Sequence, residues 1–362
     1  MGSPRLERSL AALYGSPVPE IDLVKLKGDA ATRSYFRGRR RDQGAVGPST
    51  FLVMQLPADA LRSDEGGAQP DLDRLPVLEV AELLREREVP VPEVYAEDRD
   101  AGILLLEDLG DRTFYAALRE TPRAEWPDLY GRAVDLLAEL HERTGDLPAS
   151  SVVTRRRFDR ALLHWELEHF REWGLDALVG PLGSEARQTL DAGFARIVAE
   201  IEQMPSGFVH RDYQSKNLMV SPTGALTLLD FQDALIGPRS YDLVALLCDS
   251  YVDLDVGLQE SMIDRYAALR RFPPDSVHQE FWWLTLHRKL KDAGRFVFID
   301  RVRNNPDFLQ WFPQSLAYVG RAASKIPAIR PLHELLTEAI RGFPDAVPHP
   351  TSGTESNGSD RG

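Results

Sequence analysis

The hydrophobic pattern of the chain changes near residue 110. Before this point, short apolar runs separated by polar and glycine residues predict strands, and two stripes with helical spacing predict helices. After it, apolar positions recur mainly every three or four residues, which predicts helices. We expect strands over 21–27, 34–40, 50–56 and 102–110, and helices over 6–14, 75–89, 129–145, 158–173, 187–201, 240–251, 258–269, 279–298, 308–326 and 332–341.

One pair of apolar runs interrupts the helical part. Asn217–Val220 and Ala225–Phe231 flank the tetrapeptide Ser221–Gly224, which has serine first, proline second and glycine fourth. These residue types favour a type I turn, so we expect a hairpin. Folding back at the turn places Asn217 and Asp230 side by side at the open end. An amide oxygen beside a carboxylate suits a hard cation such as Mg²⁺.

A motif just upstream adds chemistry to this hairpin. The pattern H-R-D-x-x-x-x-N runs from His210 to Asn217, and its aspartate is Asp212. Asp230 begins an Asp-Phe pair 18 residues after Asp212. In protein kinases an Asp of such a loop accepts the proton of the acceptor hydroxyl, and the Asn and the second Asp hold Mg²⁺. We therefore interpret Asp212, Asn217 and Asp230 as a phosphotransferase site. A surface loop of polar turn residues would leave their convergence unexplained.

Small and hydroxyl-bearing residues fill the segment between the first two predicted strands. Gly28 is followed by Asp29 and Thr32, and Ser34 opens the second strand. Backbone N–H groups near a glycine, together with such hydroxyls, can surround a phosphate. The segment is either a phosphate-covering loop or an ordinary hairpin connection.

Composition narrows the classes of function. A chain of 362 residues is long enough for two lobes. Its net charge of −13 argues against a nucleic-acid or anionic-membrane partner, because both need a basic surface. The single cysteine, Cys248, excludes an internal disulfide. The first residues lack the apolar core of a signal peptide, and no segment has the apolar length of a membrane span, so we expect a cytoplasmic protein.

Several phrases of the sequence resemble the aminoglycoside phosphotransferase and choline kinase superfamily. The phrases around Asp29, at 232–234 and at 287–296 are similar to a branch of cell-wall sugar kinases, which phosphorylate N-acetylmuramate and N-acetylglucosamine at the anomeric hydroxyl. The resemblance extends over about residues 20–325. The phrases that carry it lie at 28–37, 102–110, 165–170, 210–220, 228–253 and 286–296.

The resemblance implies a protein-kinase-like α+β fold, with a small antiparallel-sheet lobe and a larger, mostly helical lobe. We accordingly expect an N-lobe over 1–106, a hinge at 107–110 and a C-lobe over 111–343. The tail over 344–362 has the composition of a disordered end.

The resemblance also implies roles for individual residues. Asp212 would be the base, and Asn217 and Asp230 would be the magnesium ligands. The hinge backbone would face the adenine of ATP, and the loop at Gly28 would cover its phosphates. The expected nucleotide-binding residues are Gly28, Asp29, Thr32, Arg33, Ser34, Arg37, Glu107 and Leu109.

One position departs from the protein-kinase pattern. Met54 stands where the third strand would carry the lysine that binds the α- and β-phosphates, and no lysine occurs between Lys27 and Lys216. We expect Arg33, Arg37 or Lys216 to supply the missing charge, or the metal to carry more of it. The departure keeps open a member with weak or no activity.

The expected acceptor site rests on three charged residues. Asp233 lies three positions after Asp230 and would either bind sugar hydroxyls or remain a solvated acid. Arg288 and Lys291 share one face of a predicted helix with Arg295. They would bind an anionic group, such as the lactyl carboxylate of muramic acid, or form a solvated face paired with acids.

Two further polar residues have structural interpretations. Asp242 stands near the start of an apolar helix, where the helix dipole favours an acid. His141 lies on the helix predicted over 129–145, and we interpret it as a packing or surface residue and not as a ligand.

Three functions compete for this chain. The first is an ATP-dependent kinase of a small molecule, acting on the anomeric hydroxyl of an amino sugar. The second is an aminoglycoside or other amino-alcohol kinase, whose cationic substrates would favour an acidic acceptor site. The third is a nucleotide-binding regulatory protein without turnover, which the missing strand-three lysine favours. The first two predict a nucleotide and a small molecule as the partners, and the third predicts a nucleotide.

Overall fold

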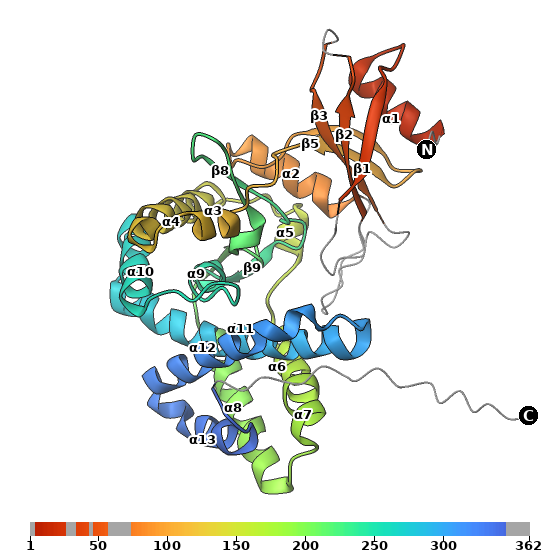
Figure 1. The fold of residues 1–362 in the computed structure, drawn as a ribbon. Helices are drawn as coiled ribbons and strands as arrows, with labels where there is room; N and C mark the ends of the chain where they lie inside the picture. The colour runs from red at the N-terminus through yellow and green to blue at the C-terminus, as the bar shows by residue number, and fades with distance from the viewer. Residues whose placement is uncertain (1–3, 27–33, 43–45, 57–73, 345–362) are drawn as a thin grey trace, which may run out of the picture. The chain divides into compact units, whose positions relative to one another are not determined.

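The structure is a computed structural model that describes residues 4–26, 34–42, 46–56 and 74–344 (Figure 1). Two compact units divide the chain. Unit 1 comprises Met1–Arg157 and Ser206–Asp242, and unit 2 comprises Phe158–Pro205 and Leu243–Gly362. The chain therefore leaves unit 1 and returns to it once before it completes unit 2.

An antiparallel sheet of five strands begins unit 1 (Figure 1). The helix α1, Pro4–Tyr14, packs on one face of this sheet, where Leu10 meets Phe51 and Val53 in a small hydrophobic core. Alternation along the strands directs the next residues, such as Met54, to the opposite face. In spatial order the strands are β1 (Ile21–Lys25), β2 (Ser34–Arg40), β3 (Thr50–Gln55), β5 (Ile103–Glu107) and β4 (Val94–Asp98).

Helices and two short sheets complete unit 1. The two-stranded sheets are β6 (Ser206–Val209) with β9 (Leu235–Pro238), and β7 (Leu218–Val220) with β8 (Leu226–Leu228). The β7–β8 connection is the predicted turn, in which the amide of Gly224 donates to the carbonyl of Ser221 at 2.9 Å. The helical elements are α2 (Pro76–Glu86), α3 (Phe114–Glu120), η1 (Arg123–Glu125), α4 (Trp126–Arg143), α5 (Val152–Arg155) and η3 (Ser215–Asn217).

Unit 2 is helical, and its elements pack around α11, Pro274–Arg303. At Gly294 an added Cβ would lie 2.7 Å from the Cα of Phe170, so only glycine allows this approach between α11 and η2. The helix α9, Tyr241–Leu247, begins at the end of unit 1. The others are α6 (Arg160–His169), the π-helix η2 (Phe170–Asp176), α7 (Ala177–Val179), α8 (Ser184–Ile201), α10 (Val256–Arg270), η4 (Pro306–Trp311), α12 (Phe312–Lys325), η5 (Pro327–Ile329) and α13 (Arg330–Ala339).

These elements confirm the predicted α+β class, in which an antiparallel sheet comes first and helices follow. The lobe limits 1–106 and 111–343 and the hinge at 107–110 stay a prediction, because the two compact units divide the chain at other positions. The tail predicted to be disordered lies outside the described residues from position 345 onward.

Candidate active site

Strand pairing holds two loops of unit 1 together. The end of β6 pairs with the start of β9, and the start of β7 pairs with the end of β8. The first loop, residues 210–217, and the second loop, residues 229–234, are therefore bounded by the same two strand pairs. This arrangement brings Asp212 and Asn217 of the first loop to the same end of the strands as Asp230 of the second loop.

His210 connects the two loops from inside. Its ring is fully buried, its Nε2 lies 2.9 Å from the carbonyl oxygen of Leu229, and its Nδ1 accepts from the amide of Asp212 at 3.2 Å. A ring nitrogen that accepts cannot carry a proton, so the hydrogen bonds define the neutral tautomer with the proton on Nε2. The imidazole thus fixes Asp212 of the first loop against the backbone of the second loop.

Asp242 holds the start of the first loop through hydrogen bonds to its backbone. Its carboxylate is fully buried and accepts from the amides of His210 and Arg211, at 2.7 and 3.0 Å. One of its oxygens also lies 3.4 Å from Nε2 of His141. The predicted place of Asp242 in the first turn of a helix is confirmed in α9. Its bonds also position the loop that carries Asp212.

Unusual backbone angles mark both loops. Arg211 has φ +77° and Asp230 has φ +62°, in the left-handed region that residues other than glycine rarely adopt. Each such residue costs on the order of 1 kcal/mol, and this strain is concentrated at functional sites where neighbouring contacts maintain it. The two residues lie directly before Asp212 and at the predicted metal ligand itself.

Amide side chains orient the two predicted metal ligands. Nδ2 of Asn217 donates to the carbonyl oxygen of Asp212 at 2.9 Å, which leaves its Oδ1 as the atom for a cation. Nε2 of Gln232 donates to Asp230 at 2.8 Å and to Asp233 at 3.2 Å. Asp233 thus lies close to Asp230, and its predicted role towards an acceptor stays a prediction. Gln232, which joins the two carboxylates, was not predicted.

Two more anchors escaped the sequence analysis. The hydroxyl of Tyr213, fully buried, donates to the carbonyl oxygen of Ala133 in α4 at 2.8 Å. Burial raises the pKa of the Tyr213 phenol well above its usual range, so the hydroxyl remains a donor. Arg156 donates to the carbonyl oxygen of Gln232 at 2.7 Å, and burial lowers the pKa of its guanidinium. The first loop is thereby fixed to a helix and the second to the end of α5.

The donor set of these loops fits one divalent cation that keeps ligands from elsewhere. Among the residues that the structure describes, no three His, Cys, Asp or Glu side chains gather into a metal cluster. An amide oxygen from Asn217 and a carboxylate from Asp230 supply only part of a coordination shell. Mg²⁺ commonly binds in this manner, through one or two protein oxygens together with water and phosphate oxygens.

The position of the missing strand-three lysine is now visible. Met54 lies in β3, buried between Tyr35 of β2 and Leu104 of β5. Protein kinases pair the lysine with a glutamate of the next helix. In this chain Glu79 of α2 instead accepts from the amide of Val152 and lies 3.8 Å from Arg155. Glu79, one of three glutamates in α2, therefore contacts α5.

Only part of the predicted nucleotide-binding set can be placed. Gly28, Asp29, Thr32 and Arg33 lie outside the described residues. Ser34 opens β2, and Glu107 closes β5, with its amide on the carbonyl oxygen of Glu93. Leu109 follows in the linker after β5, half-buried. The roles of these residues stay predictions.

Two candidate cations have identified neighbours. Arg37 of β2 contacts Asp108 and Asp111 in the linker after β5. The ammonium of Lys216 lies 5.9 Å from the ring centroid of Tyr115, which permits a cation–π contact. Both residues lie in unit 1, as do Asp212 and Asp230.

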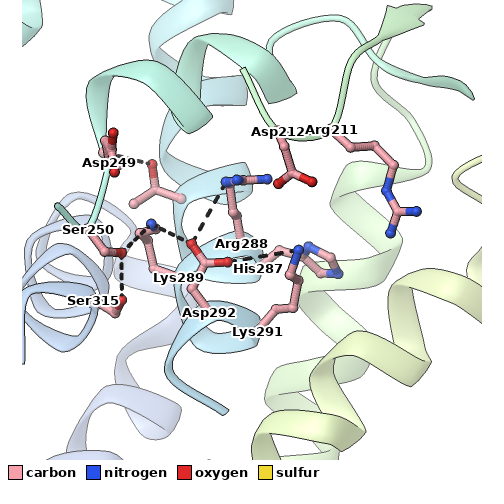
Figure 2. Close-up of polar contacts among 12 residues, drawn as sticks. Arg211, Asp212, Asp249, Ser250, His287, Arg288, Lys289, Lys291, Asp292 and Ser315 are labelled. Carbon is pink, nitrogen blue, oxygen red and sulfur yellow. Dashed lines mark hydrogen bonds and ion pairs between the residues drawn. The ribbon is translucent and has the colours of Figure 1, made fainter. Parts of the chain in front are cut away.

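The predicted acceptor cations lie in unit 2, on α11 (Figure 2). Arg288 and Lys291 are 2% and 6% exposed, so the predicted solvation of this helix face is wrong for them, whereas the pairing with an acid is observed. Nε of Arg288 and Nζ of Lys291 each lie 3.9 Å from a carboxylate oxygen of Asp292. Their role towards an acceptor stays a prediction.

No helix in the described part of the chain is both long and apolar enough to cross a membrane.

Comparison with known proteins gives consistent relatives. The N-acetylmuramate/N-acetylglucosamine kinase of Neisseria meningitidis serogroup B is 30% identical over 347 residues, which are 93% of this chain and 95% of that protein. The protein of the same name from Pseudomonas aeruginosa is 31% identical over 338 residues, 90% of each chain.

A solved structure shares the fold at low sequence identity. The amicoumacin kinase hAmiN, in complex with AMP-PNP, Ca²⁺ and Ami, superposes with a TM-score of 0.57 at 14% identity, covering 90% of this chain and 95% of that chain. The profile of the phosphotransferase enzyme family matches residues 22–279. The chain, with its two loops joined by His210, therefore belongs to the phosphotransferase enzyme family.

Proposed function

We propose that this protein is an ATP-dependent sugar kinase that phosphorylates the anomeric hydroxyl of N-acetylmuramate, N-acetylglucosamine or both. The observation that carries the reaction type is the joining of the two loops, with Asp212 and Asn217 on one and Asp230 on the other. The names of two relatives that are 30% and 31% identical over nine-tenths of the chain or more support the acceptor.

In this reaction the protein would position the sugar hydroxyl against the γ-phosphate and remove the proton of that hydroxyl. Asp212 would take the proton of the sugar hydroxyl as that oxygen attacks the γ-phosphorus. Two hydrogen bonds hold Asp212 in place. Its amide donates to His210, and its carbonyl oxygen accepts from Asn217. Such fixed geometry lowers the barrier because the reacting groups need no further ordering.

Asn217 and Asp230 would hold Mg²⁺ against the phosphates of ATP. Bound there, the cation would neutralise charge on the phosphoryl oxygens, which matters more in a chain that has Met54 at the lysine position. The amicoumacin kinase, solved with a nucleotide analogue and Ca²⁺, supports a metal and nucleotide in this fold. We expect ATP and Mg²⁺ as the working pair.

Asp233 in unit 1 is one candidate acceptor residue, and Arg288 and Lys291 in unit 2 are the others. Asp233 lies beside Asp230 through Gln232, so its carboxylate suits hydroxyls near the transferred group. Arg288 and Lys291 would suit an acidic substituent on the sugar. Both cations are buried and already lie 3.9 Å from Asp292, so an acceptor anion would share them with that carboxylate.

The test is ADP release by the purified chain with ATP, Mg²⁺ and a panel of N-acetylmuramate, N-acetylglucosamine, kanamycin and choline. We expect release with the amino sugars, and a fall of about 10²–10⁴-fold in Asp212→Ala with ATP binding retained. Asp253→Ala, at an exposed aspartate of unit 2, serves as the control. ADP release only with kanamycin or choline would favour the amino-alcohol kinase. ATP binding with no ADP release for any compound of the panel would favour the regulatory protein.

A further inference from the structure

The strongest unassigned feature is a partly buried contact between Arg37 of β2 and the linker 108–111 after β5. Nη2 of Arg37 donates to Asp108 at 3.0 Å, and its Nε lies 2.9 Å from the other oxygen of that carboxylate. Nη1 and Nη2 donate to Asp111 at 2.9 and 2.8 Å, and Nη2 also reaches the carbonyl oxygen of Gly110 at 3.1 Å. One guanidinium thus binds three residues of a four-residue segment.

Strand register explains why this side chain points at the linker. Phe36 lies opposite Val53 and packs with it in the core beneath α1. Arg37, the next residue, lies opposite Leu52 and so projects from the other face of the sheet. That face is the one to which Met54 also belongs, at the position expected for the phosphate-binding lysine.

The linker is shaped around the guanidinium. The amide of Gly110 donates to Asp108 at 3.1 Å, and Gly110 adopts φ +81°, which turns the chain so that its carbonyl oxygen and Asp111 both reach Arg37. The side chain of Asp108 is 6% exposed, whereas that of Asp111 is 80% exposed. The pair with Asp108 therefore accounts for most of the attachment, since an exposed ion pair contributes little.

We propose that Arg37 is a positioning residue that fixes β2, the strand following the Gly28 segment, to the linker after β5, and that it sets nucleotide affinity through this attachment. The inference rests on the proposed function, because it assumes that the nucleotide binds against β2 and the linker. This role differs from the direct neutralisation of the phosphates that the sequence suggested for Arg37, because its guanidinium is already paired with Asp108 and Asp111.

The test compares AMP-PNP and adenosine binding by calorimetry, using the full-length chain. If Arg37 acts through the linker, Arg37→Met and Asp108→Asn each weaken both ligands by about 5–30-fold, and the double variant is no weaker than either single one. Arg37→Lys behaves like Arg37→Met, because an ammonium cannot make the same set of contacts. Arg41→Met, which removes an exposed pair with Asp22 on the same sheet, leaves both affinities unchanged within about 2-fold.

A direct phosphate contact gives the opposite pattern. Adenosine affinity would then be unaffected by any variant, Arg37→Lys would retain AMP-PNP binding, and Asp108→Asn would tighten it by releasing the cation. This pattern, or wild-type affinities in Arg37→Met and Asp108→Asn, overturns the proposal. If Arg37→Met does not fold, Asp108→Asn and Arg37→Lys make the same distinction. A wild-type chain that binds neither ligand contradicts the proposed function instead.

Discussion

At the scale of single residues, the first loop is held mainly by hydrogen bonds to its backbone. Asp242 accepts two of its amides, and His210 accepts a third from inside the loop. Each of these acceptors is fully buried, so water cannot replace a lost partner. The position of Asp212 therefore depends on the buried side chains of Asp242 and His210.

Asp242→Asn is expected to lower both stability and turnover. An asparagine has one oxygen and one NH₂ group, so it can serve only one of the amides of His210 and Arg211, and the other is left facing a donor. We expect a loss of about 1–3 kcal/mol in the free energy of unfolding in urea, with a reduced kcat. Asp255→Asn is the matched control. Its carboxylate caps α10 in solvent by accepting from Leu258, and asparagine caps a helix equally well. Equal stability of the two variants would contradict the role of Asp242.

Some residues of the candidate site could be predicted from the sequence and others could not. Asp212, Asn217 and Asp230 stand at fixed spacings in a motif, because their chemistry requires those side chains at those positions. Gln232, Arg156 and Tyr213 act through contacts with backbone or with other side chains. Such contacts depend on packing between segments that are distant in the sequence, so no local sequence pattern predicts them.

At the scale of elements, the strands β4, β6 and β9 were not predicted, and of these β6 and β9 pair only with each other. The strand β2 has seven residues, and its limits, Ser34–Arg40, match the prediction. The strands β6 and β9 have four residues each and pair with each other across 25 intervening residues, so their own sequences carry too few alternating positions to indicate a strand. The π-helix η2 was predicted as ordinary helix, since a shifted hydrogen-bond ladder leaves the apolar stripe nearly unchanged.

The helix α11 is organised around a buried ion pair within unit 2 (Figure 2). Nζ of Lys289 lies 2.5 Å from Asp292 and donates to Ser250 at 2.8 Å, and Ser250 is bonded to Ser315 of α12. Burial by itself would raise the pKa of Asp292, but Lys289, Arg288 and Lys291 together lower it to about 2. A carboxyl group that titrates near 4 when unfolded thus stabilises the fold above about pH 4. That contribution, about 2–3 kcal/mol, is lost as the pH falls from about 4 to 2.

Lys289→Met is expected to destabilise the protein and to change its response to acid. Removing the ammonium leaves a buried carboxylate without its nearest partner, which costs about 3–5 kcal/mol at pH 7. The pKa of Asp292 then rises towards its unfolded value, so the loss of stability between pH 4 and 2 becomes smaller in the variant. Urea unfolding across this range measures both effects. Lys325→Met removes a half-exposed lysine that pairs with Glu260, and it should change stability by less than about 1 kcal/mol. Identical acid profiles for Lys289→Met and the wild type would contradict this assignment.

At the scale of the whole molecule, the predicted ligand residues divide between the units. The described candidates for nucleotide and metal, from Ser34 to Asp230, all lie in unit 1, whereas Arg288 and Lys291 lie in unit 2. The sequence could not reveal this division, because unit 1 is assembled from two segments separated by residues 158–205. The proposed nucleotide site therefore lies in unit 1, and a ligand that binds only the folded form of that unit stabilises it.

Asp230→Asn is therefore expected to remove the magnesium-dependent part of this stabilisation. At a concentration 100 times its dissociation constant, AMP-PNP with Mg²⁺ adds about 2.7 kcal/mol to the free energy of unfolding. An asparagine keeps the shape of Asp230 but loses the charge that attracts the cation, so the gain from adding Mg²⁺ should disappear while the gain from AMP-PNP alone remains. Thermal unfolding of the full chain with AMP-PNP, with and without Mg²⁺, separates the two contributions.

The control is Asp264→Asn, at an exposed aspartate of unit 2 that contacts His278. Because that residue lies outside unit 1, its variant should keep the full response to magnesium. An undiminished response in Asp230→Asn would show that the cation is bound elsewhere.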